Sequence, residues 1–180
     1  QHSQMIEAMF THIPGIKVVL PSNPVDAKGL LLQAIEDDNP VMFVEHKALY
    51  STKGDVPEDM EPIPFGKANV VKEGKDITII AWSYMVHVAM EAAEKLAADG
   101  IDAKVINIHT IKPLDEELIV AAAKETCRVV TVEEHSVIGG LGSAVCDVLS
   151  EKLPTPVLKI GVMDTFGESG PAVELIKKYG

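Results

Sequence analysis

Apolar residues along this chain alternate between short runs rich in branched side chains and longer stretches with helical spacing. The short runs predict buried strands over residues 16–20, 41–44, 76–82, 103–108, 129–132 and 157–160. The longer stretches, with apolar positions three and four apart, predict helices over residues 24–37, 86–97, 113–125, 139–152 and 171–179. Strands that alternate with helices in this way form parallel sheets, so the pattern predicts an α/β fold, a mostly parallel sheet with helices on both faces. The pattern leaves the order of the strands open.

The alternation stops between residues 48 and 66. Pro57, Pro62 and Pro64 stand there among acidic residues, and no apolar period is visible. We therefore predict a linker over residues 48–66 and a domain boundary within it. It separates a strand–helix–strand unit at residues 1–47 from a longer α/β unit at residues 67–180.

Composition and charge narrow the classes of function. Of the 180 residues, 47% are hydrophobic, which supports a real core, yet no apolar run reaches the roughly 18 residues that a membrane span needs. The net charge of −11 opposes binding to a nucleic-acid backbone, because phosphate binding needs clustered Lys and Arg. Cys127 and Cys146 lack metal-ligand spacing and stand in apolar surroundings, which favours reduced thiols over a disulfide. We expect an intracellular, cytoplasmic protein that binds neither nucleic acid nor membrane.

The chain opens on Gln1-His2-Ser3-Gln4, a polar motif with no Met ahead of it. We expect the sequence to be the C-terminal part of something longer, so that a functional site is present here only in half. His2 precedes a predicted helix that starts near Met5, and from spacing alone it is either structural or an imidazole directed into a pocket.

Two further motifs have candidate chemistry. Glu133-Glu134-His135 ends a predicted strand, where open α/β sheets gather ligands, and His135 beside two carboxylates suits a general base. The alternative is a polar residue that orders a loop or a subunit contact. Gly140-Leu141-Gly142 stands where a strand-to-helix turn holds a dinucleotide, but Val145 replaces the third glycine. Close packing between helix and strand is the favoured interpretation of these glycines.

Several segments match one known family in order: residues 1–4, 12–19, 26–30, 38–41, 45–50, 56–58 and 64–68. Together they resemble the β-subunit of the decarboxylase component of 2-oxoacid dehydrogenase complexes, the pyruvate, branched-chain and acetoin enzymes that use thiamine diphosphate. The tail departs from that family. Residues 133–145 and 164–170 resemble the C-terminal subunit of split transketolases, which leaves the substrate more open than the superfamily.

The resemblance implies a fold and a role for one histidine. Residues 1–47 would be the second half of a pyrimidine-binding domain, and residues 67–180 a transketolase C-terminal domain that supports the dimer and helps to dock partner subunits. His2 falls on the family's active-site histidine, which donates a hydrogen bond to a developing oxyanion or exchanges a proton with the intermediate.

The resemblance also implies the cofactors. Thiamine diphosphate and magnesium would be held mainly by residues upstream of Gln1 and by a partner α-subunit or N-terminal domain, and no Gly-Asp-Gly metal motif occurs in the chain. Ala34, Ile35, Asp37 and Asn39 fall on a loop whose oxygens bind a structural potassium ion in several relatives, and oxygen ligands suit a hard cation. The alternative is an ordinary helix C-terminus.

Three functions follow as alternatives. The first is oxidative decarboxylation of a 2-oxoacid with acyl transfer to lipoyl, by an assembly with the α-subunit and the lipoyl acyltransferase core, as a dimer or heterotetramer; this chain alone would be inactive. The second is ketol transfer between sugar phosphates by a split transketolase, which the absence of Arg from the first 50 residues disfavours. The third is a non-catalytic docking module that presents an acidic face to a basic partner.

Overall fold

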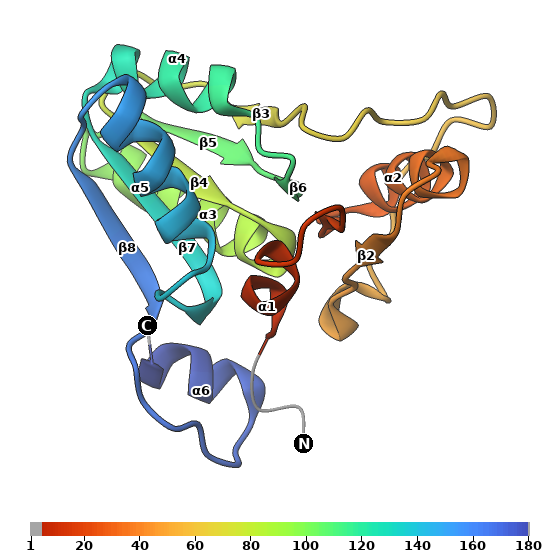
Figure 1. The fold of residues 1–180 in the computed structure, drawn as a ribbon. Helices are drawn as coiled ribbons and strands as arrows, with labels where there is room; N and C mark the ends of the chain where they lie inside the picture. Colours follow the sequence, from red (N-terminus) through yellow and green to blue (C-terminus); the bar gives the residue numbers. More distant parts are fainter. Residues whose placement is uncertain (1–4, 180) are drawn as a thin grey trace.

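The computed structural model describes residues 5–179 and contains two sheets (Figure 1). The N-terminal elements, in chain order, are α1 (Glu7–Thr11), β1 (Lys17–Val19), α2 (Pro24–Glu36), β2 (Val41–Phe43) and the short 3₁₀ helix η1 (Lys47–Leu49). The remaining elements are β3 (Asn69–Lys72), β4 (Ile77–Ala81), α3 (Ser83–Ala98), β5 (Ala103–Asn107), β6 (Thr110–Lys112), α4 (Glu116–Thr126), β7 (Val129–Ser136), α5 (Leu141–Lys152), β8 (Val157–Val162) and α6 (Ala172–Tyr179).

The larger sheet has the strand order β3-β5-β4-β7-β8. β4 pairs in parallel with both β5 and β7, and β7 pairs in parallel with β8, while β3 is antiparallel to β5 at one edge. The predicted α/β class with a mostly parallel sheet is therefore confirmed. The antiparallel edge strand β3 was not predicted, because its alternating polar and apolar residues directly follow the Pro-rich loop.

Helices cover both faces of this sheet, and the alternation of side chains along each strand produces two buried clusters. In β4, Ile79 packs with Val86 and Ala89 of α3 on one face. The next residue, Ile80, packs with Leu141 and other residues of α4 and α5 on the opposite face. Figure 1 shows α3 on the side of the sheet away from α4 and α5.

The smaller sheet, β2-β1-β6, joins two strands of the N-terminal part to a strand that follows β5. β1 and β2 are parallel, as predicted, but β2 is only half-buried rather than covered on both faces. β6 lies antiparallel to β1 and was not predicted, because only two residues separate it from the end of β5 and no turn signal marks it as a strand of its own. Lys112 of β6 also donates to the carbonyl oxygens of Thr11 (2.9 Å) and Ile13 (2.6 Å), just after α1.

The residues before the loop at 50–66 lie beyond the C-terminal ends of the strands of the large sheet, with α1 nearer to them than α2 in Figure 1. Asn107, at the end of β5, donates to Asp26 of α2 at 2.8 Å, and His87 of α3 contacts the carbonyl oxygen of Ser22 at 2.8 Å. The strand ends where an open α/β sheet binds ligands are thus partly covered by the chain's own N-terminal part. Within residues 5–179, no helix is long and apolar enough to cross a membrane.

Candidate functional site

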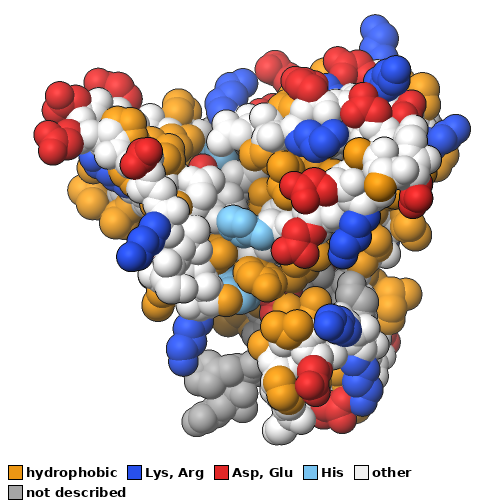
Figure 2. Space-filling model, turned by 180° about the vertical axis from the view of Figure 1, so that it is seen from behind, with side chains coloured by type: hydrophobic (Ala, Val, Ile, Leu, Met, Phe, Trp, Pro, Cys, Tyr) orange, Lys and Arg blue, Asp and Glu red, His pale blue; other side chains and the backbone are white. Residues whose placement is uncertain are grey.

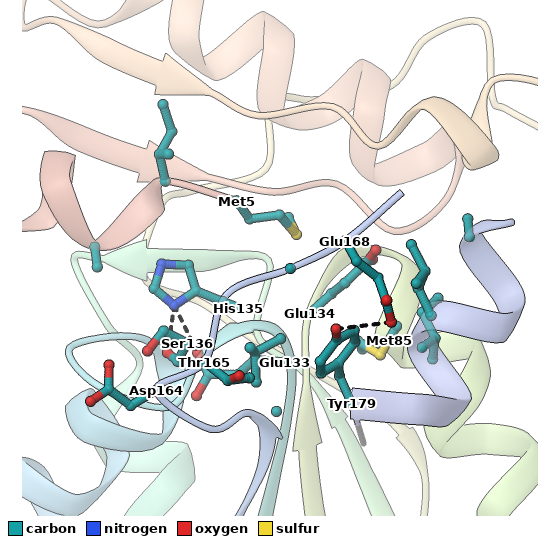
Figure 3. A pocket seen from close by; sticks show the side chains of 18 of the residues that line it. Met5, Met85, Glu133, Glu134, His135, Ser136, Asp164, Thr165, Glu168 and Tyr179 are labelled. Carbon is teal, nitrogen blue, oxygen red and sulfur yellow. Dashed lines mark hydrogen bonds and ion pairs between the residues drawn. The ribbon is translucent and has the colours of Figure 1, made fainter. Parts of the chain in front are cut away.

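A cavity of about 710 Å³ lies at the end of β7, between α1 and the segment that leads into α6 (Figure 3). Apolar side chains from α1 and its approach form one side, and the last residues of β7 form the floor. Its polar and charged lining residues are His46, Glu133, Glu134, His135, Ser136, Asp164, Thr165, Glu168 and Tyr179. Among the described residues that line it there are acids and histidines but neither Lys nor Arg, so the cavity is electrostatically unsuited to an anion.

His135 lies between two carboxylates at the floor of this cavity. Its Nδ1 is 2.5 Å from the carbonyl oxygen of Ser136 and 3.8 Å from Oε2 of Glu133, and its Nε2 is 4.0 Å from Oε2 of Glu7. All three residues are buried, with His135 the most exposed at 6%. Because a carbonyl oxygen only accepts, Nδ1 carries a hydrogen, and Nε2 is the nitrogen that faces Glu7.

Glu133 caps helix α5 from the neighbouring strand. Its two oxygens accept from the backbone N–H groups of Leu141 (2.7 Å) and Gly142 (2.9 Å), since the N-cap residue Gly140 offers no side chain. Burial raises the pKa of Glu133, and the two backbone N–H groups oppose that rise. A Cβ on Gly140 would lie 2.0 Å from Oε2 of Glu133. The glycines therefore serve close packing, as predicted, and the carboxylate occupies the place of a bound phosphate.

Glu7 is the unusual member of the group. It is 1% exposed, and neither carboxylate oxygen has a hydrogen-bond partner among the described residues. Burial raises the pKa of Glu7; His135 lowers it and the carboxylates of Glu133 and Glu134 raise it further. No local pattern of residues marks Glu7 as part of a site, because its partner on β7 is distant along the chain.

A second contact between the N-terminal part of the chain and β7 lies beside the contact of Glu7 with His135. His46 lies 2.8 Å, Nε2 to Oε2, from Glu134, and its Nδ1 accepts from the backbone N–H of Ala48, so Nε2 carries the hydrogen of this pair. The His46 ring stacks on Tyr84 of α3 with ring centroids 5.0 Å apart. Figure 2 shows histidine side chains near the middle of one face, in the hollow between two bulkier parts of the molecule.

Of the residues that the sequence suggested for a site, His135 lies at this cavity and those suggested for potassium do not. His2 lies outside the described residues. His135 lies at the cavity, within β7 rather than after it. One of its two neighbouring carboxylates is the predicted Glu133, but the other is Glu7, because Glu134 pairs with His46 instead. Beside these groups the cavity is lined by no Cys or Lys nucleophile in the described chain, and residues 5–179 contain no cluster of three His, Cys, Asp or Glu side chains arranged for a metal.

The residues proposed for potassium lie elsewhere, at the end of α2. Ala34 and Ile35 are in its last turn, where backbone carbonyl groups lack helical partners, and Asp37 is the C-cap. The Asp37 carboxylate forms an ion pair with Lys17, and its Oδ1 accepts from the backbone and side chain of Asn39, both at 2.9 Å. The Lys17 ammonium and the Asn39 donors lower the pKa of Asp37 to about 2. Backbone oxygens are therefore the available ligands, because the carboxylate already has a cation.

Comparisons with known proteins agree with this architecture. Residues 66–180 match the transketolase C-terminal domain, and residues 1–53 match the transketolase pyrimidine-binding domain. The 2-oxoisovalerate dehydrogenase subunit beta of Bacillus subtilis is 48% identical over 99% of this chain and 55% of its own length. The acetoin:2,6-dichlorophenolindophenol oxidoreductase subunit beta of Cupriavidus necator is 52% identical over 76% of this chain and 40% of its own length.

Among solved structures, a split-gene transketolase described as an inactive β4 tetramer superposes with a TM-score of 0.86 at 43% identity, over 97% of this chain and 56% of that one. The chain spans about half the length of the curated relatives it matches. Fold and matches together define the class, an α/β protein with pyrimidine-binding and C-terminal regions of the transketolase type. The chain belongs to the transketolase C-terminal domain family, within the superfamily of 2-oxoacid dehydrogenase β-subunits and transketolases, which confirms the resemblance noted in the sequence.

Proposed function

We propose that this chain is the C-terminal part of the β-subunit of a thiamine-diphosphate-dependent 2-oxoacid dehydrogenase. The observation that carries the proposal is the 48% identity to the 2-oxoisovalerate dehydrogenase β-subunit over nearly the whole chain. In this proposal residues 1–47 complete a pyrimidine-binding domain, residues 48–66 link it to the next, and residues 67–180 form the C-terminal domain. The full protein acts with an α-subunit and a lipoyl acyltransferase core, and this chain alone is inactive.

The cavity does not fit the diphosphate of the cofactor. Its lining contains Glu133, Glu134, Asp164 and Glu168 and, in the described part of the chain, no cation to balance a phosphate. The proposal therefore leaves thiamine diphosphate and magnesium to residues upstream of Gln1 and to the α-subunit. Potassium remains part of the proposal, with Ala34, Ile35, Asp37 and Asn39 as the ligand residues and backbone oxygens as the favoured ligands, because the Asp37 side chain pairs with Lys17.

What this chain contributes in the proposal is His2 and the scaffold behind it. An imidazole that donates to a developing oxyanion or exchanges a proton with the reacting group must be held in place by the residues that follow it. Those residues are α1, which packs against β1 and the end of β7. The hydrogen bonds from Lys112 hold the C-terminal end of α1, and the side chain of Glu7 at its N-terminal end is buried 4.0 Å from His135, which supports this role.

A second candidate function is ketol transfer by a split transketolase. The structural match to a split-gene transketolase at 43% identity favours it, as do the tail motifs at residues 133–145 and 164–170. The two functions differ in substrate charge. A sugar phosphate needs cationic anchors, and Lys17, one of the few Lys residues in the N-terminal part, already pairs with Asp37.

One assay separates these functions. The full-length subunit would be assembled with its α-partner and lipoyl acyltransferase core and supplied with pyruvate, branched-chain 2-oxoacids or xylulose 5-phosphate. We expect lipoyl-dependent turnover of a 2-oxoacid, and a loss of about 100-fold or more in acyl transfer for His2→Ala with cofactor affinity retained. Turnover of the sugar phosphate alone would overturn the first proposal, and equal lipoyl-dependent rates for variant and parent would remove His2 from the mechanism.

A further inference from the structure

The contact between Glu7 and His135 joins the two parts of the chain through buried ionisable groups. Glu7 comes from α1, five positions after His2, and His135 comes from β7 in the large sheet. Glu7 is 1% and His135 6% exposed, and 4.0 Å separates Oε2 of Glu7 from Nε2 of His135. That distance is a close charge contact rather than a direct hydrogen bond.

The chemistry of this pair requires one proton. Nδ1 of His135 is committed as a donor to the Ser136 carbonyl oxygen at 2.5 Å, so Nε2 is either bare or protonated. If Nε2 is bare, Glu7 must be the neutral acid, and if Nε2 is protonated, Glu7 can be the carboxylate. In both states one proton lies between the two residues. Its loss leaves a buried carboxylate facing a nitrogen lone pair, which is strongly unfavourable.

We propose that Glu7 and His135 form a one-proton latch that docks α1, which follows His2 in the chain, onto the end of β7. With the proton present, α1 is held against the large sheet. Without it, the uncompensated carboxylate of Glu7 draws toward water and α1 loosens from β7. Any effect of docking on the role of His2 rests on the proposed function. The latch itself rests only on the contact between Glu7 of α1 and His135 of β7.

The charged groups around Glu7 and His135 all affect how strongly the proton between them is retained. On β7, Glu133 lies 3.8 Å from Nδ1 of His135, and Glu134 is paired with His46 from the N-terminal part. Lys159 of β8 lowers the pKa of Glu133, while Asp164 and Glu168 line the cavity from the C-terminal segment. The nearby acids outnumber the nearby cations, so the field favours keeping the proton.

The direction of the pH effect follows from Glu7. Burial raises the pKa of Glu7 above its ordinary value, so the docked state binds a proton that the undocked state releases more readily. Docking is therefore lost as the pH rises through the raised pKa of Glu7. A group whose pKa were lowered in the docked state would give the opposite slope.

The test measures hydrogen exchange of the full-length protein in its native assembly, from about pH 5 to about pH 8. The readout is the exchange rate of backbone amides at residues 9–13 divided by that of α3, which removes the common effect of pH. In the parent this ratio should rise by about tenfold or more across the range. In Glu7→Gln the side chain at position 7 is a neutral amide that has no proton to lose and can donate to Nε2 of His135, so the ratio should stay low throughout. Glu7→Ala should give a high ratio at both ends.

Glu91→Gln makes the same chemical change at an exposed position of α3 and should retain the behaviour of the parent. If the parent and Glu7→Gln have the same ratio at every pH, the latch is refuted. The exchange measurement needs no substrate, so a protein that shows the latch yet turns over no 2-oxoacid refutes the proposed function alone. An active enzyme with a pH-independent ratio refutes the latch alone.

Discussion

Asp26 illustrates how one buried side chain joins elements that are far apart in the sequence. It is 1% exposed, and its Oδ2 accepts from the hydroxyl of Ser22 (2.8 Å), the side-chain amide of Asn23 (2.9 Å) and that of Asn107 (2.8 Å). Asn23 in turn caps α2 by accepting from the backbone N–H of Asp26. The carboxylate therefore connects the start of α2 with the end of β5.

Asp26→Ala should lower the free energy of unfolding by about 2–4 kcal/mol, because it leaves several buried donors without an acceptor. Asp26→Asn keeps an acceptor oxygen and should cost less. Urea unfolding of both variants beside Asp38→Ala, which removes an exposed carboxylate of the same chemistry, measures the difference. An unchanged midpoint for Asp26→Ala would mean that the network contributes nothing net to folding.

Among the connections between strands, the turn at Gly74 lies so close to the backbone of a neighbouring strand that only glycine fits there. Gly74 lies in the turn between β3 and β4, and a Cβ there would lie 2.2 Å from the carbonyl carbon of Ala103 and 2.4 Å from the backbone N of Lys104. Backbone atoms cannot move aside as a flexible side chain can, so the turn and the start of β5 would have to separate.

Gly74→Ala should therefore destabilise the protein by about 2–3 kcal/mol. Gly54 offers a matched control, since its added Cβ would meet only Pro24 at an ordinary 3.6 Å. Gly54→Ala should stay within about 1 kcal/mol of the parent and is expected to stabilise slightly by restricting the unfolded chain. Thermal melts of the two variants decide the matter, and equal melting temperatures would contradict the close approach at Gly74.

Some strands and contacts could be predicted from the sequence, and others could not. The strands β4, β5, β7 and β8 are continuous apolar runs between helical stretches, so their existence was readable. β7 extends through Glu133, Glu134 and His135, because buried contacts with α5 and α1 compensate these polar residues within a strand. Glu7 and His135 meet only through tertiary packing, and no local pattern encodes a contact between residues so distant in the chain.

At the scale of the whole molecule, the two regions that match separate domain models share structure. β6, from the C-terminal region, adds to the sheet of β1 and β2, and the backbone N–H of Leu20 donates to the carbonyl oxygen of His109 at 2.8 Å. Val18 and Leu20 belong to the same buried cluster as Trp82, which directly follows β4 of the large sheet. Neither region completes this core without the other, although the loop between them is largely exposed and lacks regular strands.

We therefore expect residues 5–179 to unfold as one cooperative unit despite the loop at residues 50–66. Trp82, which is fully buried beside the N-terminal strands, should report the same urea midpoint by fluorescence as the whole chain does by far-ultraviolet circular dichroism. A protease site introduced at Gly54, an exposed position, supplies the control: after cleavage the two pieces should stay associated until the same transition, because the shared sheet and core hold them. Two separated transitions in the uncut chain, with Trp82 following only one, would show that the junction contributes too little free energy to couple the regions. The proposed latch would then be acting on an already loose interface rather than tightening a common core.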